Sequence, residues 1–142
     1  MEQKKSMSKR RFGVIITYLS LISIVSVFEY GTSVEWSVIL KVTGIVSLIV
    51  FIVALTLTLF KTGLWKFTHK PLENLDEREI VLTSKSLRCA YRVFTVAVLI
   101  ILLSYSLLEK QLNIVLVASL IVFAHTLPAS IIAWTEKQVE NE

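Results

Sequence analysis

The sequence is poor in the residues that build covalent, metal-bound or flexible frameworks. Of its 142 residues, one is cysteine (Cys89), two are histidine, four are glycine and two are proline. A disulfide or a CxxC metal or redox pair requires two cysteines, so neither can form within the chain. So few glycines and prolines also exclude a low-complexity linker. These shortages exclude disulfide scaffolds and zinc-finger modules.

Charge is scarce as well, and the hydrophobic residues are unevenly placed. Only 18% of the residues are charged, 54% are hydrophobic and the mean hydropathy is +0.69. A soluble domain carries about 25% charged residues. Here the apolar residues fall into four blocks, each near the ~20 residues that a helix needs to cross a bilayer. In lipid the backbone must satisfy its own hydrogen bonds, which makes each block an α-helix.

The sequence therefore predicts an all-α fold, an integral membrane four-helix bundle forming one domain over residues 1–142. A polar segment, 61–90, separates the second span from the third, and the third span has a helical extension into the cytoplasm. The expected spans are about 12–29, 38–60, 91–108 and 112–134.

The lysines and arginines predict the orientation. Five precede residue 12 and seven lie in 61–92, whereas the other two loops hold only Lys110, and Lys41 lies inside the second block. Basic residues mark cytoplasmic segments, so both termini and the 61–90 segment are expected in the cytoplasm, with the chain in the cell membrane. The first block lacks an A-x-A-like cleavage site, which argues against a signal peptide. The net charge of +4 thus reflects membrane flanks and does not indicate a nucleic-acid partner.

The polar segment contains a helix start signal. Asn74 followed by Glu77 matches an N-cap with an acid three residues later. No glycine or proline lies between Leu75 and Leu108. The sequence therefore predicts one continuous helix from Leu75 to Leu108, rising from the cytoplasm into the third span.

This helix has an apolar stripe and charged ends. Ile80, Leu87 and Phe94 recur every seven residues. The neighbouring carboxylates of the helix start point in different directions, which favours a solvated helix start over an acid–base or metal site. The candidates for contact with a partner protein are the charged residues of this extension: Asp76, Glu77, Arg78, Glu79, Lys85 and Arg88.

Two short motifs carry a resemblance. The stretches "LENLDERE", before the third span, and "LPASIIAWTE", closing the fourth, are similar to those of small uncharacterised prokaryotic integral membrane proteins with an LDERE-type cytoplasmic motif. The similarity covers roughly residues 72–136. It implies a four-span membrane class and no particular activity.

His125 is the one candidate cofactor ligand. It lies near mid-membrane beside Pro128, and ionisable residues at that depth are functional by default. Packing is the favoured alternative, in which a neutral imidazole makes a hydrogen bond to another span. A haem held between two imidazoles of one chain is excluded because His69 lies outside the spans. The expected partners of His125 are Tyr18, Thr56, Thr58 and Ser104.

Lys41 lies near the outer end of the second span. Its long side chain can extend to the membrane interface, which accounts for a charged residue there without a functional role. A Glu29–Lys41 pair would close the first hairpin and would contribute little if solvated.

Three functions remain open. No nucleophile–base pair, metal cluster or glycine-rich phosphate loop supports an enzyme, and no cofactor is expected. The first function is a non-catalytic accessory or interaction subunit that meets a protein partner or a second copy through its cytoplasmic helix. The second is a small dimeric transporter or channel, which resembles the small multidrug transporters in length but lacks their glutamate within the first span. The third is a haem- or quinone-binding membrane subunit that uses His125.

Overall fold

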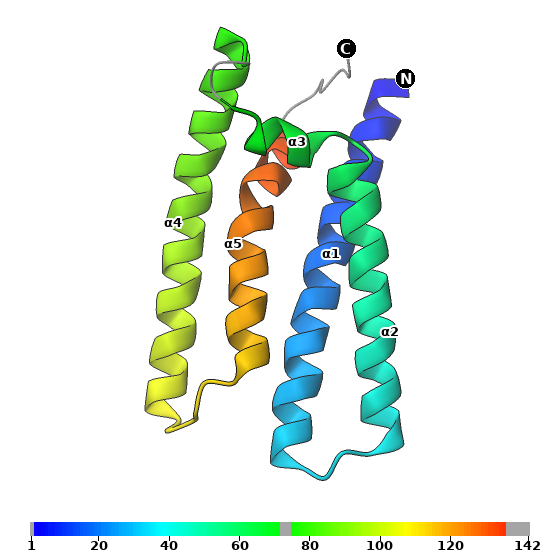
Figure 1. Cartoon of the computed structure of the whole chain (residues 1–142), viewed down its shortest axis with the longest axis vertical. Helices are drawn as coiled ribbons and strands as arrows, with labels where there is room; N and C mark the ends of the chain where they lie inside the picture. The colour runs from blue at the N-terminus through cyan, green and yellow to red at the C-terminus, as the bar shows by residue number, and fades with distance from the viewer. Residues whose placement is uncertain (1, 72–74, 136–142) are drawn as a thin grey trace.

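The computed structural model describes residues 2–71 and 75–135, and the side chains of all of these except 2–7, 66 and 67. Within this part of the chain every regular element is helical, which confirms the all-α prediction (Figure 1). A π-helical turn, η1, continues α2, and a short helix, α3, precedes α4. The bounds are α1 Glu2–Ser33, α2 Val38–Leu55, η1 Thr56–Phe60, α3 Leu64–His69, α4 Glu77–Leu107 and α5 Ile114–Thr135.

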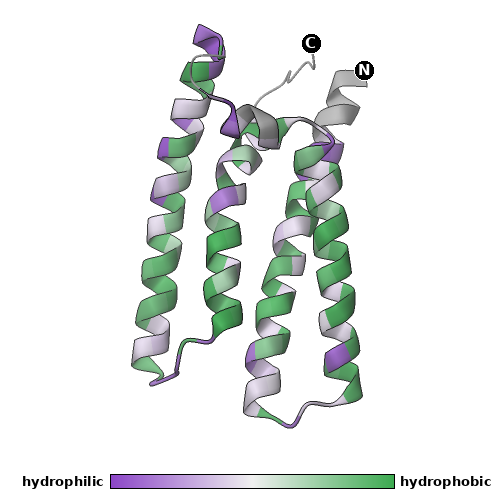
Figure 2. Cartoon of the chain, in the orientation of Figure 1, coloured by the Kyte–Doolittle hydropathy of each residue, from purple (hydrophilic) through white to green (hydrophobic). Residues whose placement is uncertain are grey.

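Four of these helices are long and apolar enough to cross a membrane, as predicted. They span Ser8–Ser33, Val38–Phe60, Glu77–Leu107 and Ile114–Thr135. Figure 2 shows their hydrophobic residues forming a band across the middle of the molecule. α4 has 31 residues, and at 1.5 Å per residue it is about 46 Å long. It is therefore longer than a bilayer crossing requires, and its first turns extend past the other helices (Figure 1).

The helices pack in the order α2, α1, α5, α4. α1 packs extensively on α2, α5 packs on both α1 and α4, and α2 and α4 lie at the two edges. Both chain ends, α3 and the start of α4 lie at one end of the bundle, called here the terminal end (Figure 1). The loops 34–37 and 108–113 lie at the opposite end, called here the hairpin end. The arrangement is thus two helical hairpins joined through α1 and α5.

The best-packed core lies at the terminal end. Gly63 adopts the left-handed conformation with φ 73°, which lets the chain turn away from η1 and begin α3. α3 then crosses the end of the bundle and buries Leu64 completely (0% exposed). The core cluster consists of Val14, Leu59, Leu64, Ala129, Ile132 and Ala133.

Small and hydroxyl-bearing residues let α1 approach α2 closely. Ser23 and Ser47 are hydrogen-bonded across the helices at 2.9 Å. A Cβ at Gly44 would make an ordinary contact of 3.5 Å with Val27, whereas one at Gly13 would overlap the Thr58 hydroxyl. In lipid, helix association depends on such close packing and on interhelical hydrogen bonds, since there is no water to exclude.

The start of α4 differs from the predicted cap. Asn74 lies outside the described residues, and Glu77 is the first helical residue rather than the third. The N-cap is Asp76, whose backbone N–H donates to Glu79 Oε2 at 3.1 Å in a capping box. Both pairs, Asn74 with Glu77 and Asp76 with Glu79, fit the rule of an N-cap residue followed three residues later by an acid. In the pair that forms, Glu79 also makes an ion pair with Lys70 at 3.6 Å.

Candidate functional site

His125 is exposed on the surface of α5 and bonds only within its own helix. Its Nδ1 lies 2.9 Å from the carbonyl oxygen of Ile121, one turn earlier. A carbonyl oxygen can only accept, so Nδ1 carries the proton and Nε2 keeps a free lone pair. The predicted hydrogen bond from His125 to another span is wrong, because the exposed ring bonds to the backbone of its own helix.

Midway along α1, the polar contact to α5 is made by Tyr18 and does not involve His125. The Tyr18 hydroxyl donates to Ser130 Oγ at 2.8 Å and lies 3.4 Å from Thr126 Oγ1. Its ring meets Phe123 edge-on at 5.5 Å. α5 remains helical through Pro128, which is buried beside these hydroxyls. Tyr18 was expected as a partner of His125, but it bonds to Ser130. Thr126 and Ser130 are four residues apart and so lie on one face of α5, and this spacing was the signal for the contact in the sequence.

His69 is the second imidazole of the chain, and it lies at the end of α3. Its Nδ1 is 2.9 Å from the Trp65 carbonyl oxygen and 3.0 Å from Thr68 Oγ1. The carbonyl can only accept, so Nδ1 carries the proton and Nε2 keeps its lone pair. The ring stacks on Trp65 at 4.2 Å, and Trp65 in turn stacks on Phe60 at 5.1 Å. His69 is exposed, like His125.

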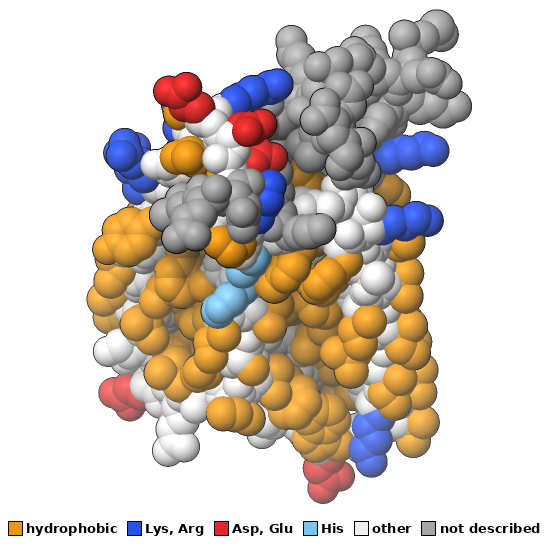
Figure 3. Space-filling view, turned by 45° about the horizontal axis from the view of Figure 1, so that its top comes forward, with side chains coloured by type: hydrophobic (Ala, Val, Ile, Leu, Met, Phe, Trp, Pro, Cys, Tyr) orange, Lys and Arg blue, Asp and Glu red, His pale blue; other side chains and the backbone are white. Residues whose placement is uncertain are grey.

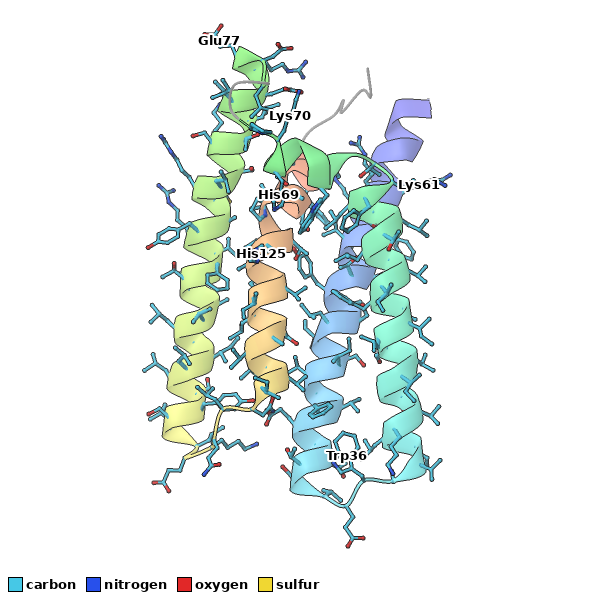
Figure 4. All side chains as sticks on the ribbon, viewed as in Figure 1. Trp36, Lys61, His69, Lys70, Glu77 and His125 are labelled. Atoms are coloured by element: carbon cyan, nitrogen blue, oxygen red, sulfur yellow. The ribbon has the colours of Figure 1, made fainter. Side chains whose placement is uncertain are left out.

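The two histidines lie side by side. α3 packs against α5, and this brings His69 next to His125 in both the stick view and the space-filling view (Figures 3 and 4). His69 lies outside the four spans, as expected, but the inference that this place separates it from His125 does not hold (Figure 4). It rested on sequence position, whereas the turn at Gly63 folds α3 back over the end of α5.

The predicted partner-contact residues lie between the N-cap of α4 and Arg88, and Glu77 at the start of this helix stands at the terminal end (Figure 4). Two of them have structural tasks, since Asp76 caps the helix and Glu79 completes the cap and pairs with Lys70. The remaining four are exposed: Glu77, Arg78, Lys85 and Arg88.

The predicted apolar stripe of α4 does not pack on the bundle at this end. Ile80 is 39% exposed and Leu87 is 48% exposed. The buried face consists instead of small and hydroxyl-bearing residues: Thr83, Ser86 and Ala90. Successive helical residues are about 100° apart, which places the stripe to one side of this buried face. The start of α4 thus contacts its own chain through small side chains and leaves larger apolar ones uncovered.

At the hairpin end, Glu29 has a different partner from the predicted one. Asn113 Nδ2 donates to Glu29 Oε1, while Asn113 Oδ1 accepts from the backbone N–H of Leu116 at 2.7 Å. The Tyr105 hydroxyl lies beside the same carboxylate. Glu29 therefore joins α1 to the α4–α5 hairpin, and the predicted Glu29–Lys41 pair does not form. Lys41 is exposed.

At the terminal end, Arg11 fixes the start of α1 to the end of α5. Its Nε and Nη2 donate to the Trp134 carbonyl oxygen at 3.2 and 2.9 Å, and its guanidinium lies 5.2 Å from the centroid of the Trp134 ring. Carbonyls in the last turn of a helix lack intrahelical donors, and a cation there complements the helix dipole. This contact keeps the two ends of the chain together.

Across the described ranges, no group of three histidine, cysteine, aspartate or glutamate side chains is placed to hold a metal ion. Comparison with protein-family models, with curated proteins and with solved structures finds no match for this chain.

Proposed function

We propose that the chain is a non-catalytic accessory or interaction subunit of the cell membrane, and that the start of α4 contacts its protein partner. The observation that carries this proposal is the pair of uncovered side chains Ile80 and Leu87 on a helix that extends past the rest of the bundle. Apolar side chains exposed within a membrane meet lipid. Exposed apolar side chains on a projecting, charged segment are typical of an interaction surface.

The basic residues elsewhere on the first half of α4 indicate the chemistry of the partner. Lys85, Arg88 and Arg92 are exposed, and at about 100° per residue they lie on the side of α4 away from its buried face. A partner segment with acidic residues flanking an apolar face complements this arrangement. We therefore expect an acidic amphipathic helix as the bound element.

The orientation belongs to the same proposal. Five basic residues precede residue 12 and seven lie in 61–92, and the start of α1, the whole of α3 and the start of α4 lie at the terminal end (Figure 1). This distribution supports a cytoplasmic location for both termini and for the start of α4.

Cysteine labelling in whole cells tests the orientation. Cys89 and Ser33 are both exposed; Cys89 lies in the half of α4 nearer the terminal end and Ser33 ends α1 at the hairpin end, so their reactivity reports the side of the membrane rather than burial. We expect Ser33→Cys, in a Cys89→Ser background, to react with a membrane-impermeant maleimide, and native Cys89 to react only after permeabilisation. The opposite pattern would reverse the orientation.

Photo-crosslinking tests the interaction surface. With p-benzoylphenylalanine at position 87, we expect irradiation of cells to give a defined adduct with one protein. The same probe at Leu107, which is 83% exposed at the other end of α4, should contact only lipid. The double change Lys85→Glu with Arg88→Glu should reduce the adduct at position 87 at least severalfold, because it repels an acidic partner.

A matched double change, Lys9→Glu with Lys61→Glu, controls for net charge at the same end. Both lysines are exposed. This variant should keep the adduct. An adduct that survives reversal of Lys85 and Arg88, or that forms equally at position 107, contradicts the proposed surface.

A second candidate function is a dimeric transporter or channel. The edge positions of α2 and α4 favour it, since each packs mainly on one neighbouring span and leaves a wide apolar face open. The mass of the adduct distinguishes the two functions. Twice the mass of the chain indicates a homodimer, and any other mass indicates a different protein.

A further inference from the structure

We propose that His69 and His125 together form a binding site for a divalent transition-metal ion. They are the two histidines of the chain, and the fold brings them side by side from α3 and α5 (Figure 4). Both rings are exposed on the surface of the chain, and His69 ends α3 outside the four spans, so an ion approaches the pair from the terminal end.

Hydrogen bonding prepares both rings as ligands. In each, Nδ1 lies 2.9 Å from the carbonyl oxygen four residues earlier, Trp65 for His69 and Ile121 for His125. These bonds fix the tautomer, which leaves the Nε2 lone pair of each ring free. A metal-binding histidine commonly donates its other N–H to a carbonyl in this way, which orients the ring and increases its basicity.

The ligand type selects the class of ion. Imidazole nitrogen suits Zn²⁺, Cu²⁺ and Ni²⁺, whereas Mg²⁺ and Ca²⁺ prefer oxygen ligands. Two imidazoles occupy two coordination positions, and water completes the others. The nearby carboxylate of Glu79 is already committed to Lys70 and to the cap of α4.

The aromatic stack beside the site provides a reporter. Trp65 lies parallel to the His69 ring with 4.2 Å between centroids. A paramagnetic ion such as Ni²⁺ bound to His69 is therefore close enough to quench the fluorescence of Trp65. Trp36 lies at the hairpin end of the bundle, far from the site (Figure 4).

The test is equilibrium dialysis of the full chain in mild detergent against Ni²⁺, with a purification tag that contains no histidine. We expect one Ni²⁺ per chain. Either His69→Gln or His125→Gln should weaken binding by roughly 10²-fold, because the second ligand acts intramolecularly. The double variant should lose little more than either single one. Cys89→Ser should bind like the wild type, since its thiol takes no part.

Fluorescence gives a readout that does not depend on the histidine variants. Ni²⁺ should quench wild-type emission, and Trp65→Phe should abolish that quenching while leaving the Ni²⁺ stoichiometry unchanged. If a glutamine variant loses its helical circular dichroism, the corresponding asparagine variant replaces it. Absence of stoichiometric binding, wild-type affinity in either single variant, or bound Ni²⁺ without quenching of Trp65 would overturn the proposal.

Discussion

Leu64→Ala is expected to destabilise the bundle by about 2–5 kcal/mol, the range for emptying a fully buried leucine site. Leu64 is 0% exposed and packs against Ala129, Ile132 and Ala133 of α5. In a membrane the cost does not come from exposing leucine to water. It comes from the lost packing contacts around the cavity, which the small neighbouring side chains cannot fill. Loosening of α3 should accompany this loss, because Leu64 anchors that helix.

The free energy of unfolding, measured by circular dichroism during a denaturing-detergent titration, checks this expectation. Leu107→Ala is the matched control, because the same atoms are removed from a side chain that is 83% exposed. In lipid or detergent the control should change the free energy of unfolding little, since solvent chains replace the missing contacts. Equal effects of the two substitutions would show that α3 does not pack as described.

Gly13→Ala is expected to destabilise the fold by about 1–3 kcal/mol, the usual cost of overpacking. A Cβ at this position would overlap Thr58 Oγ1 and lie 3.2 Å from Thr58 Cβ and Cγ2. Thr58 is 5% exposed in η1 and has little room to move. α1 must therefore shift away from η1, which also disturbs the core cluster that begins with Val14.

Gly44→Ala provides the control, because its Cβ would meet only Val27 at an ordinary 3.5 Å. Both glycines are in helices, so alanine gains the same helix propensity at each. We expect no loss of stability for Gly44→Ala, and partial recovery when Thr58→Ala is added to Gly13→Ala. If the two glycine substitutions behave alike in the same titration, the close approach of α1 to η1 is contradicted.

Much of the fold could be predicted because its signals are local. The hydrophobic runs give the four spans, and the unbroken stretch from Leu75 to Leu108 gives the long α4. The capping rule was less selective, because two pairs, Asn74 with Glu77 and Asp76 with Glu79, fit it within six residues. The structure adopts the second pair, and Glu79 also forms an ion pair with Lys70.

The partners of the polar side chains could not be predicted in this way. The expected partners of His125, Tyr18 among them, followed from depth in the membrane, and the possible pairing of Glu29 with Lys41 followed from their places in one hairpin. Depth leaves the rotation of each helix about its axis undetermined, and that rotation decides whether a side chain faces a neighbouring helix or lipid. Thus Tyr18 meets Ser130, Glu29 meets Asn113, and His125 turns to its own backbone.

The sequence alone determined that the chain crosses the membrane four times as helices, because a bilayer imposes the length and apolar composition of each span. It also determined that the third of these helices is longer than a span requires and begins with charged side chains. Tertiary structure alone decided that α3 folds back over α5 and that the best-packed core lies at the terminal end. It also decided that His69 lies beside His125. These features depend on a left-handed turn at Gly63 and on the fit of small side chains between helices. Such contacts join residues far apart in the chain, and no periodicity within either segment encodes them.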